Sequence, residues 1–579
     1  MFKYKLNTFY NVADYSEDYI GNYLKAIGIS DANKFMSPSP VDELDPYLLQ
    51  NMDKGIKLLK RAIDTLVEVY IVVDSDPDGY TSSSIFYNYI NTLYPNITLT
   101  YSLHEGKEHG VELNKVPSTC GLVVIPDAGS SQKNELLTLA EMGKYVLVLD
   151  HHESDITIEH PNIAIINNQL SPQFSNKALS GAGVTFKFVQ AFDEKYNGGH
   201  KWRDYYDLAT LGIISDVMYS GNLDNNYIIN TGLKNIKNHF LAALVNKQSY
   251  SISSTANPNK IDIAFYITPI INGVIRIGTQ EEKENLFKAM RDNTITEHVY
   301  TEFRGKERDE TFYEYVARES ANIKSRQDAL ITKTTEAIFK KIEEQGLQNH
   351  QIIVYKTSLN DKNEVPKVLT GLVAMKICAK YNRCTLVLRP QLIDGVQYYM
   401  GSGRGKRADG FDSLREFCLE SGLVEYAQGH ALAHGVSLQE DNIEKLVAYA
   451  DEQLKDMDFG SETIEVCGIQ PPIAALNEFA ANKHLYGNGI PEPTFAFTGA
   501  ITKQDIQIMG ARQDTVKIKM NNITFIKFHA KQLIEDIQNM QNTYFRLTIA
   551  GRPQQNEFRG RISLQVVIDN FMVEPYELI

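Results

Sequence analysis

The chain has 579 residues, of which 43% are hydrophobic and 22% charged, the proportions of an ordinary soluble globular protein. A chain of this length should hold about three or four domains. Its net charge of −14 argues against tight nonspecific binding of duplex DNA, because that binding scales with the number of phosphates neutralised. Any nucleic-acid track on this protein must therefore be a local basic groove on an acidic body.

The sequence gives no sign of a membrane or secretory segment. No run approaches the ~18 consecutive apolar residues that a membrane helix needs, and Met1–Tyr10 lacks the apolar stretch of a signal peptide. The cysteines are odd in number and have no CxxC spacing, which predicts reduced, mostly buried thiols in a cytoplasmic protein. They lie at positions 120, 378, 384, 418 and 467.

Two regions are expected before the middle of the chain. Residues 1–64 begin as a polar lead-in and end in a helix, because apolar residues recur at helical spacing between Leu48 and Ile63. Residues 65–235 alternate apolar strands with helical patterns, which predicts a parallel α/β domain.

Three carboxylates, Asp74, Asp76 and Asp78, directly follow the apolar strand pattern of Leu66–Val73. Pro77 and Gly79 interrupt that pattern, which predicts that the acids lie on a loop, and that Thr81 to Ser84 cap the next helix. Three anions this close repel one another unless a cation neutralises them. A hard divalent metal ion would do so, although a solvated acidic turn is the alternative.

Further acids and histidines follow other apolar segments. Asp127 follows Leu122–Pro126, His151 and His152 follow Tyr145–Asp150, and Asp216 follows the segment Leu208–Ile214. The carboxyl ends of parallel strands line one crevice, so these groups are expected to converge there. Mixed carboxylate and imidazole donors suit Mn²⁺ or a similar transition metal better than bare Mg²⁺. The expected ligands are Asp74, Asp76, Asp78, Asp127, His151 and Asp216.

These acidic motifs, in this order, resemble the four motifs of the DHH phosphoesterases. Other stretches resemble the RecJ branch of that family, the single-strand DNA exonucleases. They are Phe35–Ser39, Asp45–Leu49, Ser180–Lys187 and Gln428–Ala431. The resemblance implies an α/β protein with a parallel-sheet DHH domain, a long bridging helix, a second α/β domain of the DHHA1 type and a C-terminal OB-fold.

The resemblance also implies roles at the metal site. Two ions of Mn²⁺ or Mg²⁺ would activate a water and stabilise the leaving oxygen, with Asp127 bridging them. Asp76, Asp78, His151 and Asp216 would complete the ligand set, and Asp74 would be a ligand or the partner of one. His152 would orient a ligand or contact the scissile phosphate.

Residues 236–349 are expected to connect the two α/β domains. Thr268–Arg276 resembles a RecJ segment and keeps Asn272 and Arg276. The resemblance implies that both bind the substrate. The alternative for Arg276 is an ordinary guanidinium on the surface. Residues 309–345 have a helical pattern without proline or glycine. Such a helix would span roughly 55 Å and could bridge two domains.

Residues 350–460 are expected to form the DHHA1-type domain. The glycine-rich stretch Tyr399–Arg407 predicts a turn whose backbone approaches a phosphate, unless it is only a flexible basic loop. Through the resemblance, Ser402, Arg404 and His430 become candidate phosphate ligands. Glu105 stands where the family usually has an arginine, with Lys107 two residues further on.

Residues 461–579 are rich in strand patterns and mix basic with aromatic residues, which suits a groove that binds single-stranded DNA. The basic residues are Lys517, Lys519, Lys527, Arg546, Arg552, Arg559 and Arg561. The aromatic ones are Phe525, Phe528, Tyr544, Phe545 and Phe558. About half of these aromatics are expected to belong to the core instead.

The resulting hypothesis is a metal-dependent exonuclease that degrades single-stranded DNA from the 5′ end to 5′-mononucleotides, in repair, recombination or replication. It would act as a monomer on single-stranded DNA, with a single-strand-binding protein or a helicase as partner. One alternative is a DHH phosphodiesterase of short oligoribonucleotides or cyclic dinucleotides. Another is an inactive RecJ-like replication scaffold, which the intact ligand set disfavours.

Overall fold

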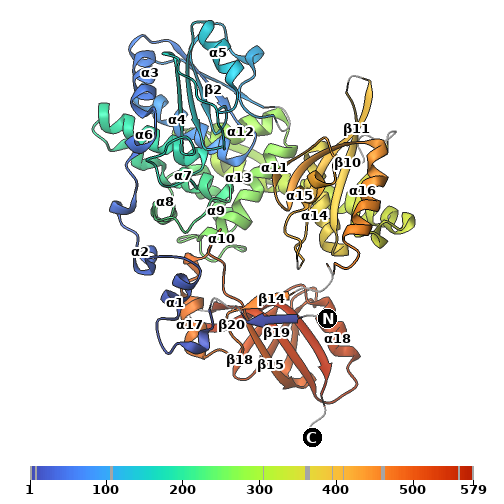
Figure 1. Ribbon diagram of the computed structural model, residues 1–579. Helices are drawn as coiled ribbons and strands as arrows, with labels where there is room; N and C mark the ends of the chain where they lie inside the picture. Colours follow the sequence, from blue (N-terminus) through green and yellow to red (C-terminus); the bar gives the residue numbers. More distant parts are fainter. Residues whose placement is uncertain are drawn as a thin grey trace. The chain divides into compact units, whose positions relative to one another are not determined.

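The computed structural model describes residues 3–6, 10–104, 108–303, 305–358, 365–393, 395–408, 410–457, 459, 463–558 and 561–576 (Figure 1). Contacts divide the chain into two compact units. The first comprises Met1–Ala321 and Thr463–Ile579, and the second comprises Asn322–Glu462.

The first unit is built around the predicted parallel sheet, whose strand order is β3-β2-β4-β5-β6. Its interior strands are nearly continuous apolar runs, as expected when helices cover both faces. Helices α3 and α6 pack on the face of Leu147 and Ile166, whereas α5 packs on the opposite face with Val146 and Val148. The strands are β2 (Glu68–Val73), β3 (Leu99–Leu103), β4 (Cys120–Pro126), β5 (Tyr145–Asp150) and β6 (Ile163–Asn167), and the helices are α3 (Met52–Asp64), α4 (Pro77–Leu93), α5 (Lys133–Glu141), α6 (Gly181–Tyr196) and α7 (Tyr206–Ser215).

The segment that follows the parallel sheet in the sequence, residues 223–311, is mostly helical. It contains α8 (Leu223–Lys234), α9 (His239–Lys247), α10 (Lys260–Asp262), the π-helical turn Ile263–Ile267, α11 (Thr268–Ile277), α12 (Gln280–Arg291) and the hairpin of β7 (His298–Phe303) and β8 (Lys306–Thr311). The predicted long helix is α13 (Phe312–Gln345). Its 34 residues span about 51 Å, and the boundary between the two units lies within it.

The second unit has a mixed sheet of order β12-β13-β11-β10-β9, in which only β9 and β10 are parallel to each other. The predicted turn over Tyr399–Arg407 is wrong, because most of this stretch lies in strand β11. Glycines tolerate close strand contact here: a Cβ at Gly401 would collide with the Val387 carbonyl oxygen. The elements are β9 (Ile352–Lys356), β10 (Cys384–Ile393), β11 (Val396–Arg404), β12 (Tyr426–His430), β13 (Ala433–Gln439), α14 (Thr370–Tyr381), α15 (Leu414–Glu420) and α16 (Glu440–Gln453).

The C-terminal part of the first unit is a six-stranded sheet of order β15-β19-β20-β18-β17-β16. Its strands are β15 (Phe495–Ile501), β16 (Ile506–Met509), β17 (Thr515–Met520), β18 (Ile523–Lys527), β19 (Phe545–Phe558) and β20 (Arg561–Pro575). Helices α17 (Ile473–Ala481) and α18 (Lys531–Asn539) pack against it.

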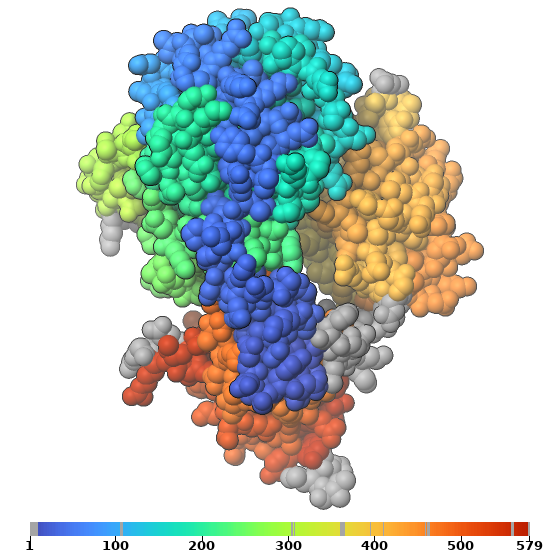
Figure 2. Space-filling view, turned by 60° about the vertical axis from the view of Figure 1, so that its left-hand side comes forward, coloured from blue at the N-terminus to red at the C-terminus, as the bar shows by residue number. Residues whose placement is uncertain are grey.

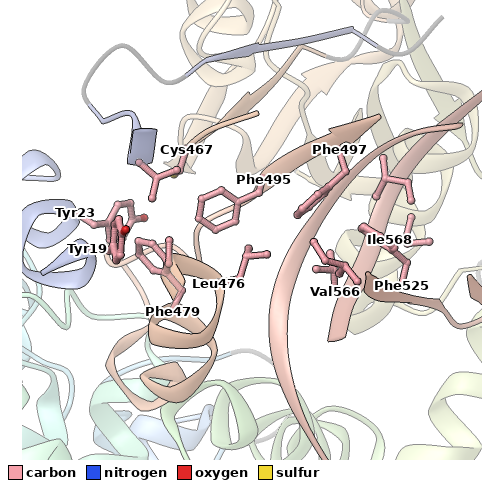
Figure 3. Close-up of a cluster of buried hydrophobic side chains, with 14 of the residues drawn as sticks. Tyr19, Tyr23, Cys467, Leu476, Phe479, Phe495, Phe497, Phe525, Val566 and Ile568 are labelled. Atoms are coloured by element: carbon pink, nitrogen blue, oxygen red, sulfur yellow. The ribbon is translucent and has the colours of Figure 1, made fainter. Parts of the chain in front are cut away.

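The N-terminal residues form part of the core of this C-terminal sheet. Strand β1 (Lys3–Leu6) pairs in parallel with β14 (Thr463–Val466), and α1 (Tyr19–Ala26) packs on α17. Tyr23 and Phe479 lie in one buried cluster (Figure 3). Further along, α2 (Ala32–Met36) contacts α8. In Figure 2 the N-terminal segment (blue) lies at the surface, beside C-terminal residues (orange and red) and beside residues from the middle of the chain (green). The segment expected as a lead-in therefore ties the two sheets of this unit together.

All five cysteines are buried and free, as predicted. No helix in the described part of the chain is both long and apolar enough to cross a membrane.

Candidate metal centre

The first acidic motif spans the turn from β2 into α4. Asp74 directly follows the strand, Asp76 is the N-cap of the helix and accepts a hydrogen bond from Gly79 N–H at 2.9 Å, and Asp78 lies in the first helical turn. The predicted cap at Thr81 to Ser84 is therefore wrong. Asp76 caps the helix one residue before Pro77, a favoured first helical residue because its missing N–H would be unpaired there anyway.

Asp78 is held by the beginning of another helix. Its carboxylate accepts hydrogen bonds from Ser180 Oγ at 3.0 Å, Gly181 N–H at 2.7 Å and Ala182 N–H at 3.1 Å. The positive N-terminal end of α6 thus stabilises the buried charge. In the sequence this stretch was notable only as part of a resemblance, and its contact with Asp78 spans more than a hundred residues.

Asp127 has a strained backbone at the end of β4. Its φ of 64° is in the left-handed region, which residues other than glycine rarely adopt. Its N–H donates to the Leu149 carbonyl at 2.8 Å, which fixes the turn. A Cβ on Gly181 would collide with Asp127 Oδ1, so only glycine fits there. The carboxylate is therefore set in one place by both backbone and packing.

His151 brings the separate motifs together. Its Nε2 atom lies 3.3 Å from Asp127 Oδ1, 3.4 Å from Asp216 Oδ2 and 3.9 Å from Asp78 Oδ2. Asp216 follows helix α7 rather than a strand, which corrects the expectation that all these groups follow strands. Within the described residues, His151 Nε2 and Asp127 Oδ1 are buried without a hydrogen-bond partner. Buried polar atoms without partners are costly, and a bound cation would satisfy both.

The predicted ligands fall into two groups of three, and Asp127 and His151 also form a third group with His152. Donor atoms of Asp74, Asp76 and Asp127 lie within 4.8 Å of one another, as do those of Asp78, His151 and Asp216. Asp127 and His151, one from each group, are the pair at 3.3 Å. The structure thus brings together all six residues expected as ligands, and their oxygen and imidazole donors fit Mn²⁺ and, less closely, Mg²⁺.

Three of the crowded carboxylates, those of Asp76, Asp127 and Asp216, hold protons more tightly than usual because their pKa values are raised. Burial, with the charges of Asp78 and Asp74, raises the pKa of Asp76 to about 6. Burial, with Asp78 and Asp76, raises the pKa of Asp216 to about 8, and similar causes raise the pKa of Asp127 well above its usual range. This repulsion is the kind that cations relieve. Burial also lowers the pKa of His151, which favours the neutral imidazole that ligates metals.

Asp150 accepts hydrogen bonds from both His151 and His152. Although burial opposes its ionisation, hydrogen bonds from His152 and Ser130 lower its pKa to about 2. The hydrogen bond to Asp150 in turn raises the pKa of His152 to about 9. His152 is exposed, and its ring lies 4.4 Å from that of His151. A positively charged imidazole at the edge of the ligand group suits contact with a phosphate.

Asp74 has neighbours that the sequence did not reveal. Its Oδ2 lies 2.7 Å from His109 Nδ1 and its Oδ1 accepts Gly110 N–H at 3.1 Å. His104 Nε2 lies 4.0 Å from the same Oδ1. His109 was not singled out because a lone histidine in a loop carries no pattern. Glu105 and Lys107, which bear on the predicted phosphate pocket, lie outside the described residues.

Asn272 and Arg276 both lie on α11, which contacts α4. Burial lowers the pKa of the Arg276 guanidinium, and the negative charge of Asp76 opposes that shift. Arg276 is thus close enough to the metal centre to sense its charge. This position favours the interpretation of Arg276 as a substrate-binding residue over its interpretation as an ordinary surface residue.

Ser402, Arg404 and His430 lie on one face of the sheet in the second unit. Arg404 and His430 both pair with Ala433, and Ser402 pairs with Gly435 two residues along the same strand. Cross-strand partners lie on the same face of a sheet, and so do alternate residues of one strand. The side chains of all three residues are therefore on the same face. Ser402 Oγ lies 2.9 Å from the hydroxyl of Thr370, the first residue of α14.

The aromatic residues of the C-terminal sheet divide as expected between core and surface. Phe525 and Phe545 are fully buried, whereas Phe528 and Tyr544 are exposed. The basic residues divide too: Arg552 is bound to Asp569 and Glu492, while Lys519, Arg546 and Arg561 are exposed. Arg559 and the side chain of Phe558 are outside the described residues.

Comparison with known families agrees with this architecture. Residues 68–213 match the model of the DHH family, N-terminal domain, and residues 475–570 match that of the RecJ OB domain. The chain is 33% identical, over 96% of both lengths, to YorK of the SPbeta prophage of Bacillus subtilis (strain 168), which is named as a single-strand DNA-specific exonuclease. It is 24% identical to the single-stranded-DNA-specific exonuclease RecJ of the same organism, covering 94% of this chain and 66% of that one.

Among solved structures, RecJ from Thermus thermophilus in complex with Mn²⁺ has a similar fold. The TM-score is 0.71 at 19% sequence identity, covering 97% of this chain and 76% of that one. The parallel sheet, its cluster of acidic residues and the match to the DHH model identify a DHH protein. Within that class, the chain belongs to the RecJ family.

Proposed function

We propose that this protein is a divalent-metal-dependent exonuclease that hydrolyses single-stranded DNA from the 5′ end to 5′-mononucleotides. The observation that carries the proposal is the pair of three-residue donor groups around the Asp127–His151 contact. Support for the substrate comes from the names of YorK and RecJ as single-strand DNA-specific exonucleases.

Two ions of Mn²⁺ or Mg²⁺ would be held by the two groups, Asp74, Asp76 and Asp127 on one side and Asp78, His151 and Asp216 on the other. When bound, such ions polarise a phosphoryl oxygen and lower the pKa of a water molecule. Asp127 belongs to the first group and lies 3.3 Å from His151 of the second, so it would adjoin both ions. The Thermus thermophilus RecJ structures, described as complexes with Mn²⁺ and with Mg²⁺, support this choice of metals.

The chain's own residues would orient the substrate around this centre. His152, which Asp150 keeps protonated, would donate a hydrogen bond to the reacting phosphate. Arg276 and Asn272 on α11 would bind the backbone next to it, since a guanidinium pairs with two phosphate oxygens. Ser402, Arg404 and His430 would bind the 5′-terminal phosphate, and their position on one face of a sheet supports a common ligand.

The C-terminal sheet would hold the remaining strand. Exposed Phe528 and Tyr544 offer ring faces for bases, and exposed Lys519 and Arg546 offer charges for phosphates. We propose residues 461–579, together with the N-terminal segment that completes their core, as the DNA-binding domain, residues 65–235 as the DHH domain, residues 236–349 as the connecting segment and 350–460 as the DHHA1-type domain. We further propose a monomeric, cytoplasmic protein of DNA repair, recombination or replication that works with a single-strand-binding protein or a helicase.

One assay tests the activity and its direction. A single-stranded oligonucleotide carrying a label at its 5′ or its 3′ end is incubated with the protein and Mn²⁺, with chelator as the control. We expect the 5′ label to appear at once as mononucleotide, while the 3′ label passes through progressively shorter products. The reverse order would overturn the direction, and the absence of any cleavage would overturn the enzyme assignment.

A further inference from the structure

Two exposed aromatic side chains lie on an unusual helical turn before α11. The chain forms a π-helical turn over Ile263–Ile267, and such turns are rare and frequently mark functional sites. Phe265 is 70% exposed and Tyr266 41% exposed, whereas the residues at both ends of the turn are buried. The turn therefore presents both rings to solvent.

The exposed surface of α11 continues from this aromatic pair. Three further residues are partly exposed at helical spacing, Pro269, Asn272 and Arg276, and the other residues from Thr268 to Ile275 are buried. Residues three and four apart share one face of a helix. A single stripe therefore runs from Phe265 to Arg276, over about 16 Å.

The stripe is attached to the metal centre through two helices. The π-helical turn contacts α7, whose last residue precedes Asp216. At the other end α11 contacts α4, which begins directly after Asp76. The charge of Asp76 acts on Arg276, so the Arg276 end of the stripe lies near the metal centre, and Phe265 lies about 16 Å from Arg276 along the helix.

No ring or cation in the described part of the chain covers Phe265 or Tyr266. Adjacent exposed aromatic residues are typical of surfaces that bind a ligand. The order along the stripe is a guanidinium, an amide and then two aromatic rings. Phosphates bind the first two, and nucleobases stack on the last two.

We propose that Phe265 and Tyr266 form a platform on which bases of the single-stranded DNA stack as the strand leaves the metal centre. The platform rests on the function proposed above, with Arg276 and Asn272 at the backbone near the reacting phosphate. At ~3.4 Å between stacked nucleotides, a distance of about 16 Å corresponds to a few nucleotides. The rings would thus meet bases several positions 3′ of the nucleotide being removed.

Kinetics on substrates of two lengths test the platform. Phe265→Ala should raise KM about tenfold on a long single-stranded oligonucleotide, as the loss of one stacked base predicts, with kcat unchanged. On a dinucleotide, which cannot reach the platform, it should match the wild type. Phe265→Trp should restore the KM. Tyr300 is an exposed tyrosine on the β7–β8 hairpin, and Tyr300→Ala should leave the KM unchanged.

Oligonucleotides that lack a single base at successive positions give the second readout. Wild type should bind them more weakly, in chelator, when the missing base is a few nucleotides from the 5′ end, and Phe265→Ala should show no such position. Equal KM and equal binding profiles for both proteins would overturn the platform and leave the exonuclease proposal standing. If the wild type cleaves no single-stranded DNA, the exonuclease proposal fails, and the binding profiles alone then decide the platform.

Discussion

Asp150 accepts a hydrogen bond from Nδ1 of His152 at 2.8 Å, and the same oxygen accepts the backbone N–H of His151 at 2.7 Å. Its second oxygen accepts Ser130 N–H at 2.9 Å. The buried carboxylate of Asp150 thus fixes the positions of His151, a predicted ligand, and of its exposed neighbour His152. Partners of this kind are not ligands themselves, yet they fix ring orientation and tune the site.

Replacing Asp150 with Asn should therefore reduce activity while the protein stays folded. Asparagine replaces one carboxylate oxygen by an amide nitrogen, which cannot accept the hydrogen bonds that this oxygen accepts in Asp150. The two histidines should therefore change their orientation. We expect kcat to fall about 10- to 100-fold, with a higher Mn²⁺ concentration at half-maximal rate. The exposed Asp155→Asn nearby is the control. An unchanged metal dependence in Asp150→Asn would argue against this positioning role.

Asp127→Ala tests the centre of the site directly. Loss of the carboxylate between the two donor groups should lower hydrolysis at least about 100-fold, while binding of single-stranded DNA survives. Without metal the variant should have about the same stability as wild type, because losing a buried carboxylate with a raised pKa stabilises it while alanine at a φ of 64° destabilises it. Thermal unfolding with Mn²⁺ checks the assignment: ions that bind the native state raise the melting temperature of the wild type and of the exposed-site control Glu141→Ala. An equal rise in Asp127→Ala would contradict it.

Much of the metal centre could be predicted because it depends on local patterns. Asp74, Asp127 and His151 each follow a short apolar run that favours a buried strand, and parallel strands bring their ends together. Asp216 was placed by the same reasoning, but its apolar run is helix α7. A short run that is buried on all sides does not distinguish a helix from a strand.

Other features depend on contacts between distant residues. Gly401 and Gly403 suggested a turn, yet they lie in a strand whose neighbours approach closely. The ring of Tyr23 packs against that of Phe479 across more than 450 residues of sequence. No window of local sequence contains such a contact, so the N-terminal segment was expected to be only a lead-in.

The packing of Tyr23 leads to a prediction about stability. Its buried ring lies edge-on to Phe479 at 5.7 Å, and its hydroxyl donates to the Pro491 carbonyl at 2.8 Å. Tyr23→Ala should lower the free energy of unfolding by about 3–5 kcal/mol and weaken DNA binding, whereas Tyr23→Phe should cost about 1 kcal/mol. Urea unfolding and binding in chelator measure both. If Tyr23→Ala leaves the C-terminal sheet as stable as before, the shared core has no energetic role.

His434 makes the second unit sensitive to acid. It lies buried on β13 between Gly403 and Gly429 of the neighbouring strands. Burial, with the charges of Arg404 and Arg415, lowers its pKa to about 4 from an ordinary 6.5. The unfolded chain takes up a proton below 6.5 and the folded chain does not.

Stability should therefore fall as the pH drops from 6.5 to 4, by about 3 kcal/mol in total. His434→Leu should remove this part of the pH dependence, and the exposed His529→Gln should keep it. Unfolding free energies measured from pH 7 to 4 provide the test. Parallel curves for wild type and His434→Leu would show that the buried imidazole does not control acid stability.

The last prediction concerns the 5′ end of the substrate. Ser402, Arg404 and His430 share one face of the sheet, and a Cβ at Gly371, in the first turn of α14, would lie 2.6 Å from Arg404 Nη2. Glycine there gives the guanidinium room beside a helix N-terminus, a combination that favours an anion. Arg404→Ala should thus remove most of a preference for 5′-phosphorylated over 5′-hydroxyl DNA, about 1.5–3 kcal/mol. Metal binding should be unchanged, and the exposed Arg407→Ala is the matched control. If Arg404→Ala still favours the 5′-phosphate as strongly as wild type, that group binds elsewhere, and Arg276 is the next residue to change.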